Sequence, residues 1–110
     1  MKLPNAARAI VDMEKLRDYC FSESHPRGKH KARVFESALG LTASDVTELR
    51  EAILSSIQTE ETAVGERYEY GQSYLLDFSM KRQGREAIVR SAWIVRQGED
   101  APRLTSCYVL

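Results

Sequence analysis

The sequence predicts an α+β fold in which about three N-terminal helices pack on one face of an antiparallel β-meander of three to four strands. Apolar residues recur with a helical period as far as residue 57, and the period changes to two from residue 68 onward. Gln83-Gly84 separates two alternating runs, as a tight hairpin turn does. A helical half followed by a strand half is typical of the α+β class.

Length and composition fit one soluble domain over residues 1–110. The chain is 43% hydrophobic and 29% charged, which suffices for a single core. Sixteen basic residues balance sixteen acidic ones, so any affinity for anions must be local. No apolar run approaches the roughly 20 residues of a membrane span, and no signal peptide is recognisable, so we expect a cytoplasmic protein without membrane contact.

The two cysteines, Cys20 and Cys107, lack the spacing of a CxxC motif or of a zinc site. An oxidising setting would allow them to pair. Buried reduced thiols are the favoured interpretation, because free cysteine behaves as a small hydrophobe.

The first helix is expected after Asp12, whose carboxylate can accept hydrogen bonds from the free amides of the first turn. A short strand is conceivable over residues 9–11. Residues 22–28 should break the helix, since Pro26 disfavours helix at His25 and Gly28 permits a left-handed backbone. The apolar stripe of this helix comprises Met13, Leu16 and Cys20.

Two further helices follow. The second is expected from Lys29 to Leu39, and Gly40 is a natural stop. Thr42 and Asp45 have the spacing of a capping box before the third helix. The apolar face of the third helix comprises Val46, Leu49, Ile53 and Ile57.

The strands begin at Tyr68, after an exposed acidic connection over residues 59–66. If Gln83 and Gly84 form the loop, one face of the hairpin becomes largely apolar and the other gains cross-strand charge pairs. The predicted apolar pairs are Met80–Ala87, Phe78–Val89, Leu76–Ser91 and Tyr74–Trp93, and the charge pairs are Lys81–Glu86 and Asp77–Arg90. A last strand over residues 103–110 has no decisive register. The uncovered face should carry Asp77, Arg90, Arg96 and some of Thr105, Ser106 and Tyr108.

The stretch from His25 to Phe35 holds the strongest candidate chemistry. Two histidines can act as base and acid, and the cations around them, with the amides of the helix start, can stabilise a developing anion. These are the parts needed for RNA cleavage by the 2′-hydroxyl, which requires neither a metal nor a cofactor. The candidates are His25, His30, Lys31, Arg27, Lys29 and Arg33. The competing interpretation is a solvated basic helix start.

Arg90, Thr105 and Tyr108 form a second candidate group on the open sheet face. They offer a cation, a hydroxyl and a phenol to a phosphate, although Arg90 could simply pair with Asp77. No Walker loop, GxGxxG, HExxH, zinc pattern or GxSxG elbow occurs in the sequence.

Several motifs resemble an uncharacterised bacterial domain family. They are His25-Pro26-x-Gly28-x-His30-Lys31-Ala32-x-Val34-Phe35, Ala38-Leu39-Gly40, Lys15-Leu16-x-x-Tyr19, and the segments 91–95 and 107–110. That family occurs as small standalone proteins, often encoded beside another small protein, and at the C-termini of polymorphic toxins. The resemblance implies a toxin module restrained by a cognate antitoxin or immunity protein.

The order of helices and sheet is also similar to the barnase–EndoU–colicin–RelE group of ribonucleases, a likeness of fold alone. It implies His30 and Lys31 as leading catalytic candidates, with His25, Arg90, Thr105 and Tyr108 in support. Substrate contacts would come from Arg27, Lys29, Arg33 and Arg96. The alternative hypothesis is a non-catalytic binding module, an antitoxin, immunity protein or adaptor, whose basic 25–33 segment docks an acidic partner.

Overall fold

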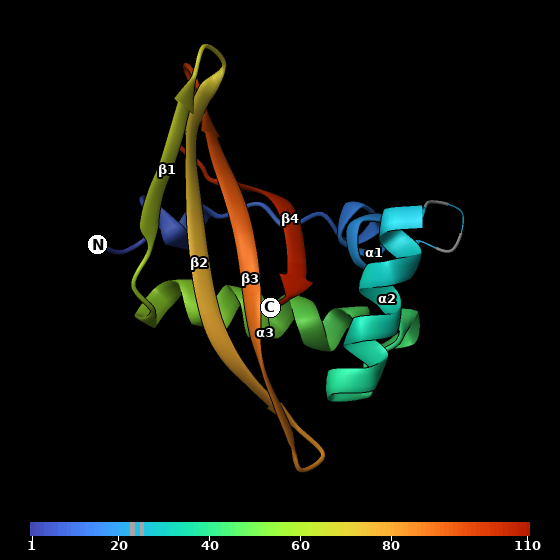
Figure 1. The fold of residues 1–110 in the computed structure, drawn as a ribbon. Coiled ribbons are helices and arrows are strands. Elements are labelled where there is room, and N and C mark those ends of the chain that lie inside the picture. Colours follow the sequence, from blue (N-terminus) through green and yellow to red (C-terminus); the bar gives the residue numbers. More distant parts are fainter. Residues whose placement is uncertain (23, 25) are drawn as a thin grey trace.

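The computed structural model describes residues 1–22, 24 and 26–110. Within these residues, three α-helices precede a four-stranded antiparallel sheet with strand order β1-β2-β3-β4 (Figure 1). The predicted α+β fold and meander are confirmed. The elements are α1 (Met13–Phe21), α2 (Pro26–Leu39), α3 (Val46–Thr59), β1 (Ala63–Tyr68), β2 (Gly71–Arg82), β3 (Arg85–Arg96) and β4 (Arg103–Val109), with 3₁₀ turns η1 (Ala6–Arg8) and η2 (Ala43–Asp45).

The β2–β3 hairpin has the predicted register. Gln83 and Gly84 form its loop with φ angles of 50° and 76°, the positive values that a tight hairpin turn needs. Asp77 lies opposite Arg90 and is ion-paired with it. Lys81 lies opposite Glu86, but Glu86 instead accepts a hydrogen bond from Ser79 Oγ at 2.9 Å.

The start of the sheet differs from the prediction. The expected strand from Tyr68 is broken by a turn at residues 69–70, and the segment expected to be an exposed connection contributes β1. Nearly every residue of β1 is exposed, so the sequence shows no apolar alternation there. Tyr68 and Tyr70 stack across the turn, with ring centroids 5.2 Å apart.

The helix ends agree with the prediction at three places. Asp12 caps α1 by accepting from the Lys15 amide at 3.1 Å, the Thr42–Asp45 capping box is present, and Gly40 ends α2 at φ 66°. In place of a strand over residues 9–11, a single parallel bridge joins Ile10 to Arg103 of β4.

The start of α2 was predicted wrongly. The helix begins at Pro26 rather than at Lys29, because proline fits the first helical position, where no amide hydrogen bond is needed. Gly28 is helical and not left-handed. Gly28 is needed here because it has no side chain and so leaves room for Ser22: a Cβ on Gly28 would lie 2.7 Å from Ser22 Cβ and 2.9 Å from Ser22 O.

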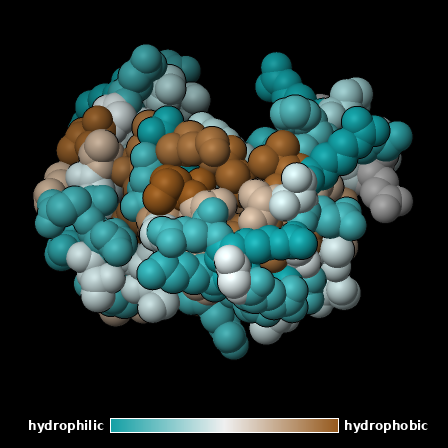
Figure 2. Space-filling model, turned by 60° about the horizontal axis from the view of Figure 1, so that its bottom comes forward, coloured by the Kyte–Doolittle hydropathy of each residue, from teal (hydrophilic) through white to brown (hydrophobic). Residues whose placement is uncertain are grey.

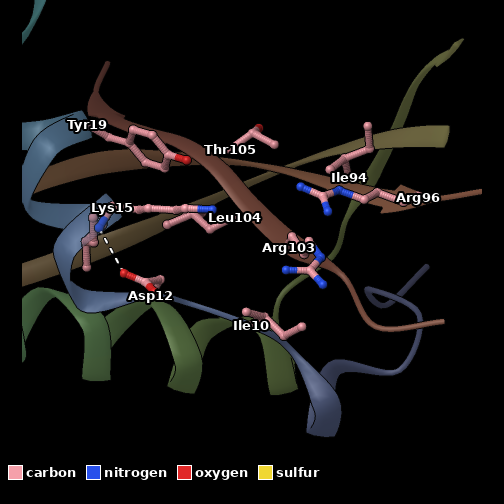
Figure 3. A pocket seen from close by; sticks show the side chains of 10 residues that line it. Ile10, Asp12, Lys15, Tyr19, Ile94, Arg96, Arg103, Leu104 and Thr105 are labelled. Carbon is pink, nitrogen blue, oxygen red and sulfur yellow. Dashed lines mark hydrogen bonds between the residues drawn. The ribbon is translucent and has the colours of Figure 1, made fainter. Parts of the chain in front are cut away.

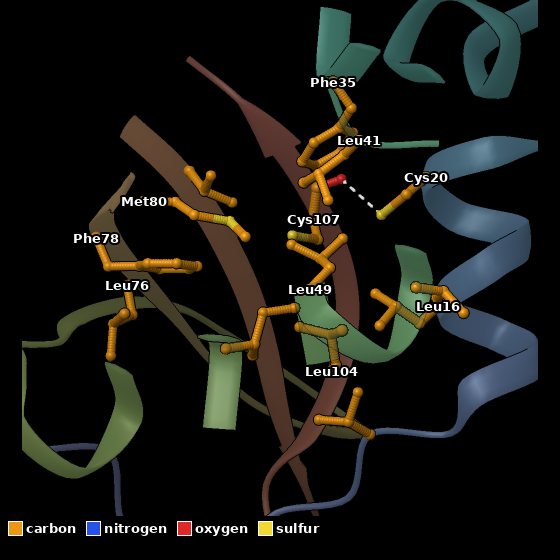
Figure 4. Close-up of a cluster of buried hydrophobic side chains, with 14 of the residues drawn as sticks. Leu16, Cys20, Phe35, Leu41, Leu49, Leu76, Phe78, Met80, Leu104 and Cys107 are labelled. Atoms are coloured by element: carbon orange, nitrogen blue, oxygen red, sulfur yellow. Dashed lines mark hydrogen bonds between the residues drawn. The ribbon is translucent and has the colours of Figure 1, made fainter. Parts of the chain in front are cut away.

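The core lies between the helices and the inner face of the sheet. In Figure 1, α3 crosses behind the strands, and α1 and α2 lie beside β4. Figure 4 shows side chains of these elements meeting in the core, among them Leu16, Leu49 and Cys107, each 0% exposed. The inner sheet face contributes Leu76, Phe78, Met80, Val89, Trp93 and Leu104.

Both cysteines are free and buried, as predicted. Cys20 Sγ donates to the Cys107 carbonyl at 3.3 Å and joins α1 to β4. Hydrogen bonding with Cys20, together with burial, raises the pKa of the Cys107 thiol. The thiols are therefore part of the packing between helix and sheet.

The surface also carries apolar side chains. Ile88 and Leu110 are 43% and 59% exposed, and the Leu110 amide donates to the Ile88 carbonyl at 2.9 Å. Figure 2 shows one face on which apolar side chains, in brown, gather between hydrophilic rims. None of the helices in the described residues is long and apolar enough to cross a membrane.

Candidate functional site

Lys31 links the basic motif to the sheet. It lies on the side of α2 that faces β4, one turn beyond the close approach of Gly28 to Ser22. Its Nζ donates to Ser106 Oγ at 3.2 Å and lies 5.4 Å from the centroid of the Tyr108 ring. A lysine ammonium within about 6 Å of an aromatic ring is attracted to the negative ring face. The motif lysine is thus held against β4 by two contacts.

Arg90 lies beside the same tyrosine on the open face of the sheet. It is the cross-strand neighbour of Tyr108 on one side and of Asp77 on the other. The ion pair is bidentate, with Arg90 Nε 2.8 Å from Asp77 Oδ1 and Nη2 2.9 Å from Oδ2. Hydrogen bonding with Asp77, and then with Tyr108, raises the pKa of Arg90, and the guanidinium lowers the pKa of Asp77.

We call Lys31, Tyr108 and Arg90, with Ser106, the phenol cluster. It joins α2 to β3 and β4, and Asp77 of β2 holds its far end. Two cations and two hydroxyls on one surface can hold a phosphate group. Cations such as Lys31 and Arg90, and hydroxyl donors such as those of Ser106 and Tyr108, favour the ionised form of a bound phosphate.

His30 lies outside this cluster. It precedes Lys31 by one residue, so it points about 100° away around the helix axis, and it is exposed. No hydrogen bond or ion pair joins it to another residue in the described part of the chain. Lys29 and Arg33 are exposed on α2 as well. His25, the other histidine predicted for the site, lies outside the described residues.

A shallow pocket between α1 and α2 connects Lys31 with Arg27. Its volume is about 530 Å³, and its lining residues are Asp18, Tyr19, Ser22, Ser24, Arg27, Gly28 and Lys31. Arg27, expected to contact substrate, therefore lies beside Lys31.

Thr105 and Arg96 belong to a different surface. Thr105 is the extra residue of a bulge, because Ala92 pairs with Ser106 while the next residue, Trp93, pairs with Leu104. It lines a pocket between α1 and β4 together with Arg96. The structure thus divides the predicted site residues between the phenol cluster, the exposed side of α2 and this pocket.

The pocket between α1 and β4 also contains polar residues that the sequence analysis missed. Lys15 and Tyr19 come from α1, and Arg103 comes from β4 (Figure 3). Lys15 and Arg103 are far apart in the sequence, and the packing of α1 on β4 with the bridge between Ile10 and Arg103 places them together. The motif Lys15-Leu16-x-x-Tyr19 contains two of these residues, but nothing in it points to Arg103.

Metal-ligating side chains do not cluster in the described residues. Within residues 1–22, 24 and 26–110, no three His, Cys, Asp or Glu side chains lie close enough to hold a metal ion. The cations and hydroxyls of the phenol cluster are instead the groups that bind oxyanions directly.

Comparison with known proteins gives one finding. Searches of curated proteins and of solved structures gave no significant match. A protein-family profile described as a domain of unknown function, DUF6883, matches residues 2–110. The match spans both the helices and the complete sheet, including every residue of the phenol cluster. The chain therefore belongs to the DUF6883 family.

Proposed function

We propose that this domain is a metal-independent ribonuclease, the toxin half of a toxin–antitoxin or toxin–immunity pair. The observation that carries the proposal is the contact of Lys31, from the basic motif, with Tyr108, which lies opposite Arg90. Helix α2 and the strands β3 and β4, which are far from it in the sequence, thereby present two cations and two hydroxyls on one open surface. RNA supplies a phosphodiester that fits such a surface without a cofactor.

The proposed reaction is attack by the RNA 2′-oxygen on the adjacent phosphorus. The 2′-hydroxyl loses its proton to a base, the O2′–P bond forms, and the P–O5′ bond breaks as the 5′-oxygen gains a proton. The products are a 2′,3′-cyclic phosphate and a 5′-hydroxyl. Lys31 and Arg90 would stabilise the additional negative charge on phosphorus oxygens, and Ser106 and Tyr108 would orient them.

Asp77 would act as a positioning residue. Its bidentate contact occupies Nε and Nη2 of Arg90 and fixes the guanidinium plane on the sheet surface. The N–H groups of Arg90 that contact neither Asp77 nor Tyr108 would then be available for a phosphate oxygen. Preorganised donors of this kind lower a barrier because they need no rearrangement in the transition state.

His30 would transfer a proton from the rim of the cluster. His30 is the neighbour of Lys31 and is exposed, so its imidazole would act on a substrate that extends from Lys31 around the helix. Histidine is suited to this task near neutral pH.

Expression in a sensitive bacterial host tests the toxin proposal. We expect the wild-type chain to stop growth, and Lys31→Met or His30→Ala with Lys31→Ala to be harmless. Lys81→Met is the matched control, since it removes an exposed lysine that lies outside the predicted site residues. If the wild type and the double variant are equally harmless, or equally toxic, the catalytic role of His30 and Lys31 is excluded. Rescue by a small protein encoded nearby would identify the partner.

A second candidate function is a binding module, and one observation favours it. Lys29, His30 and Arg33 form an exposed basic side of α2. All three belong to α2, so they present a fixed row of polar side chains to an acidic partner surface. Two results together would favour this role. The wild type would retain a partner in a pull-down that Lys29→Glu/Arg33→Glu does not retain, and the wild type would not degrade RNA.

A further inference from the structure

The pocket between α1 and β4 is built by the N-terminal segment. The Ile10 amide donates to the Pro102 carbonyl at 2.8 Å, and the Leu104 amide donates to the Ile10 carbonyl at 3.1 Å. These bonds hold the beginning of α1 beside the edge of β4. The space enclosed between them measures about 110 Å³.

Three cationic side chains line this pocket, and each comes from a different element. Lys15 extends from α1, Arg96 from the end of β3 and Arg103 from the start of β4 (Figure 3). Two residues with hydroxyl groups, Tyr19 of α1 and Thr105 of β4, also line the pocket. The chain has no net charge, so this grouping is a local excess of positive charge.

The acidic groups near the pocket are already engaged. Asp12, the one carboxylate in its lining, caps α1 by accepting from the Lys15 amide. Glu99 accepts from Arg103 Nε at 3.0 Å, and this hydrogen bond is the main reason that the pKa of Glu99 is lowered. Glu99 does not belong to the lining. Only Nε of Arg103 takes part in this ion pair; the terminal amino groups of Arg103 do not.

The other walls of the pocket are apolar. Leu16 and Leu104 are 0% and 7% exposed, and Ile94 is half-buried. Lys15 and Arg96 are exposed and Arg103 is half-buried, so the buried leucines strengthen the attraction between a bound anion and the cations on one side of the pocket only. The pocket therefore combines three cations with a partly apolar lining, as an oxyanion site can.

We propose that this pocket binds a phosphate group, either as free phosphate or at the end of a nucleotide or RNA strand. A tetrahedral phosphate has oxygens in several directions and can accept from donors on three elements, whereas a planar carboxylate accepts in one plane. The small volume suits a single such group. The site is additional to the phenol cluster, about 10 Å away along β4 from Thr105 to Tyr108, and does not depend on the proposed ribonuclease activity.

Isothermal titration of the full chain with inorganic phosphate at constant ionic strength tests the proposal. We expect saturable binding that Lys15→Gln and Arg103→Gln each weaken about five- to tenfold, the effect of losing one charged hydrogen bond at a partly exposed site. Arg17→Gln is the matched control: it removes an exposed cation from the same helix but from outside the pocket. Circular dichroism establishes that each variant is folded.

Two further arms identify the source of the phosphate. Tighter binding of a 5′-phosphorylated oligoribonucleotide than of its 5′-hydroxyl form would assign an RNA end, and equal binding of adenosine monophosphate and inorganic phosphate would assign the free group. Unchanged phosphate binding in Lys31→Met separates this site from the phenol cluster. Absence of phosphate binding by the wild type, or equal weakening by Arg17→Gln, would overturn the proposal.

Discussion

Gly28→Ala should destabilise the protein, although replacing a helical glycine with alanine ordinarily stabilises it. Helix propensity alone favours alanine by about 1 kcal/mol. At this position, however, the new Cβ would lie 2.7 Å from Ser22 Cβ and 2.9 Å from Ser22 O. Neither atom is the end of a flexible side chain, so α2 must move away from the end of α1. Such overpacking costs about 1–3 kcal/mol.

The balance of these two terms is a net destabilisation of about 1 kcal/mol, reaching about 2 kcal/mol if α2 cannot shift. For a chain of this length, about 1 kcal/mol lowers the Tm by roughly 4 °C. Calorimetry on Gly28→Ala provides the measurement. Ser37→Ala, at an exposed position of the same helix, is the control and should be neutral or slightly stabilising. A Gly28→Ala variant with a Tm equal to or above that of the wild type would refute the close-contact explanation.

Three other predictions follow from the structure. Arg82→Met should lower the free energy of unfolding by about 2–4 kcal/mol, measured by urea denaturation, because this side chain is only 12% exposed. The substitution removes its ion pairs with Glu48 and Asp45 and its hydrogen bonds to the carbonyls of Leu39 and Gly40. A loss no greater than that caused by Lys81→Met, at an exposed position, would contradict this prediction. Asp77→Asn should make the free energy of unfolding less dependent on pH in the acid range. The pKa of Asp77 is lowered below 3.8 in the folded protein, so the Arg90 ion pair stabilises the fold at neutral pH and is lost as the pH falls through and below that value. An unchanged pH dependence would contradict this reasoning. Both thiols should resist a thiol reagent until denaturant is added, since Cys20 and Cys107 are 0% exposed; rapid labelling of the native protein would show that the core opens readily.

The hairpin register was predictable because one pairing satisfied two requirements together. It gave an apolar inner face, which includes the buried Phe78 and Val89, and it set Asp77 opposite Arg90 on the other face. A one-residue slip would have reversed both faces. Lys31 could be named from its motif, but its contact with Tyr108 depends on how α2 packs against β4.

Other features left no local signal. β1 is exposed along most of its length, so its pairing with β2 produces no apolar period. The pocket between α1 and β4 depends on a bridge between Ile10 and Arg103, residues that are distant in sequence. Thr105 is the extra residue of a bulge and lines this pocket, whereas Tyr108 pairs with Arg90, although the sequence predicts both in one group. Contacts set by bridges and bulges depend on three-dimensional packing.

The most direct test of the proposed function is the rate of RNA cleavage by the purified chain in the presence of a chelator. We predict cleavage that leaves 2′,3′-cyclic phosphate ends, a loss of about 10²-fold or more in Lys31→Met, and a near-wild-type rate in Lys81→Met. Lys31 contacts Ser106 and Tyr108, whereas Lys81 is an exposed lysine of β2 outside the predicted site residues. Equal rates for the two variants, or no cleavage by the wild-type protein, would contradict the phenol cluster as a reaction centre.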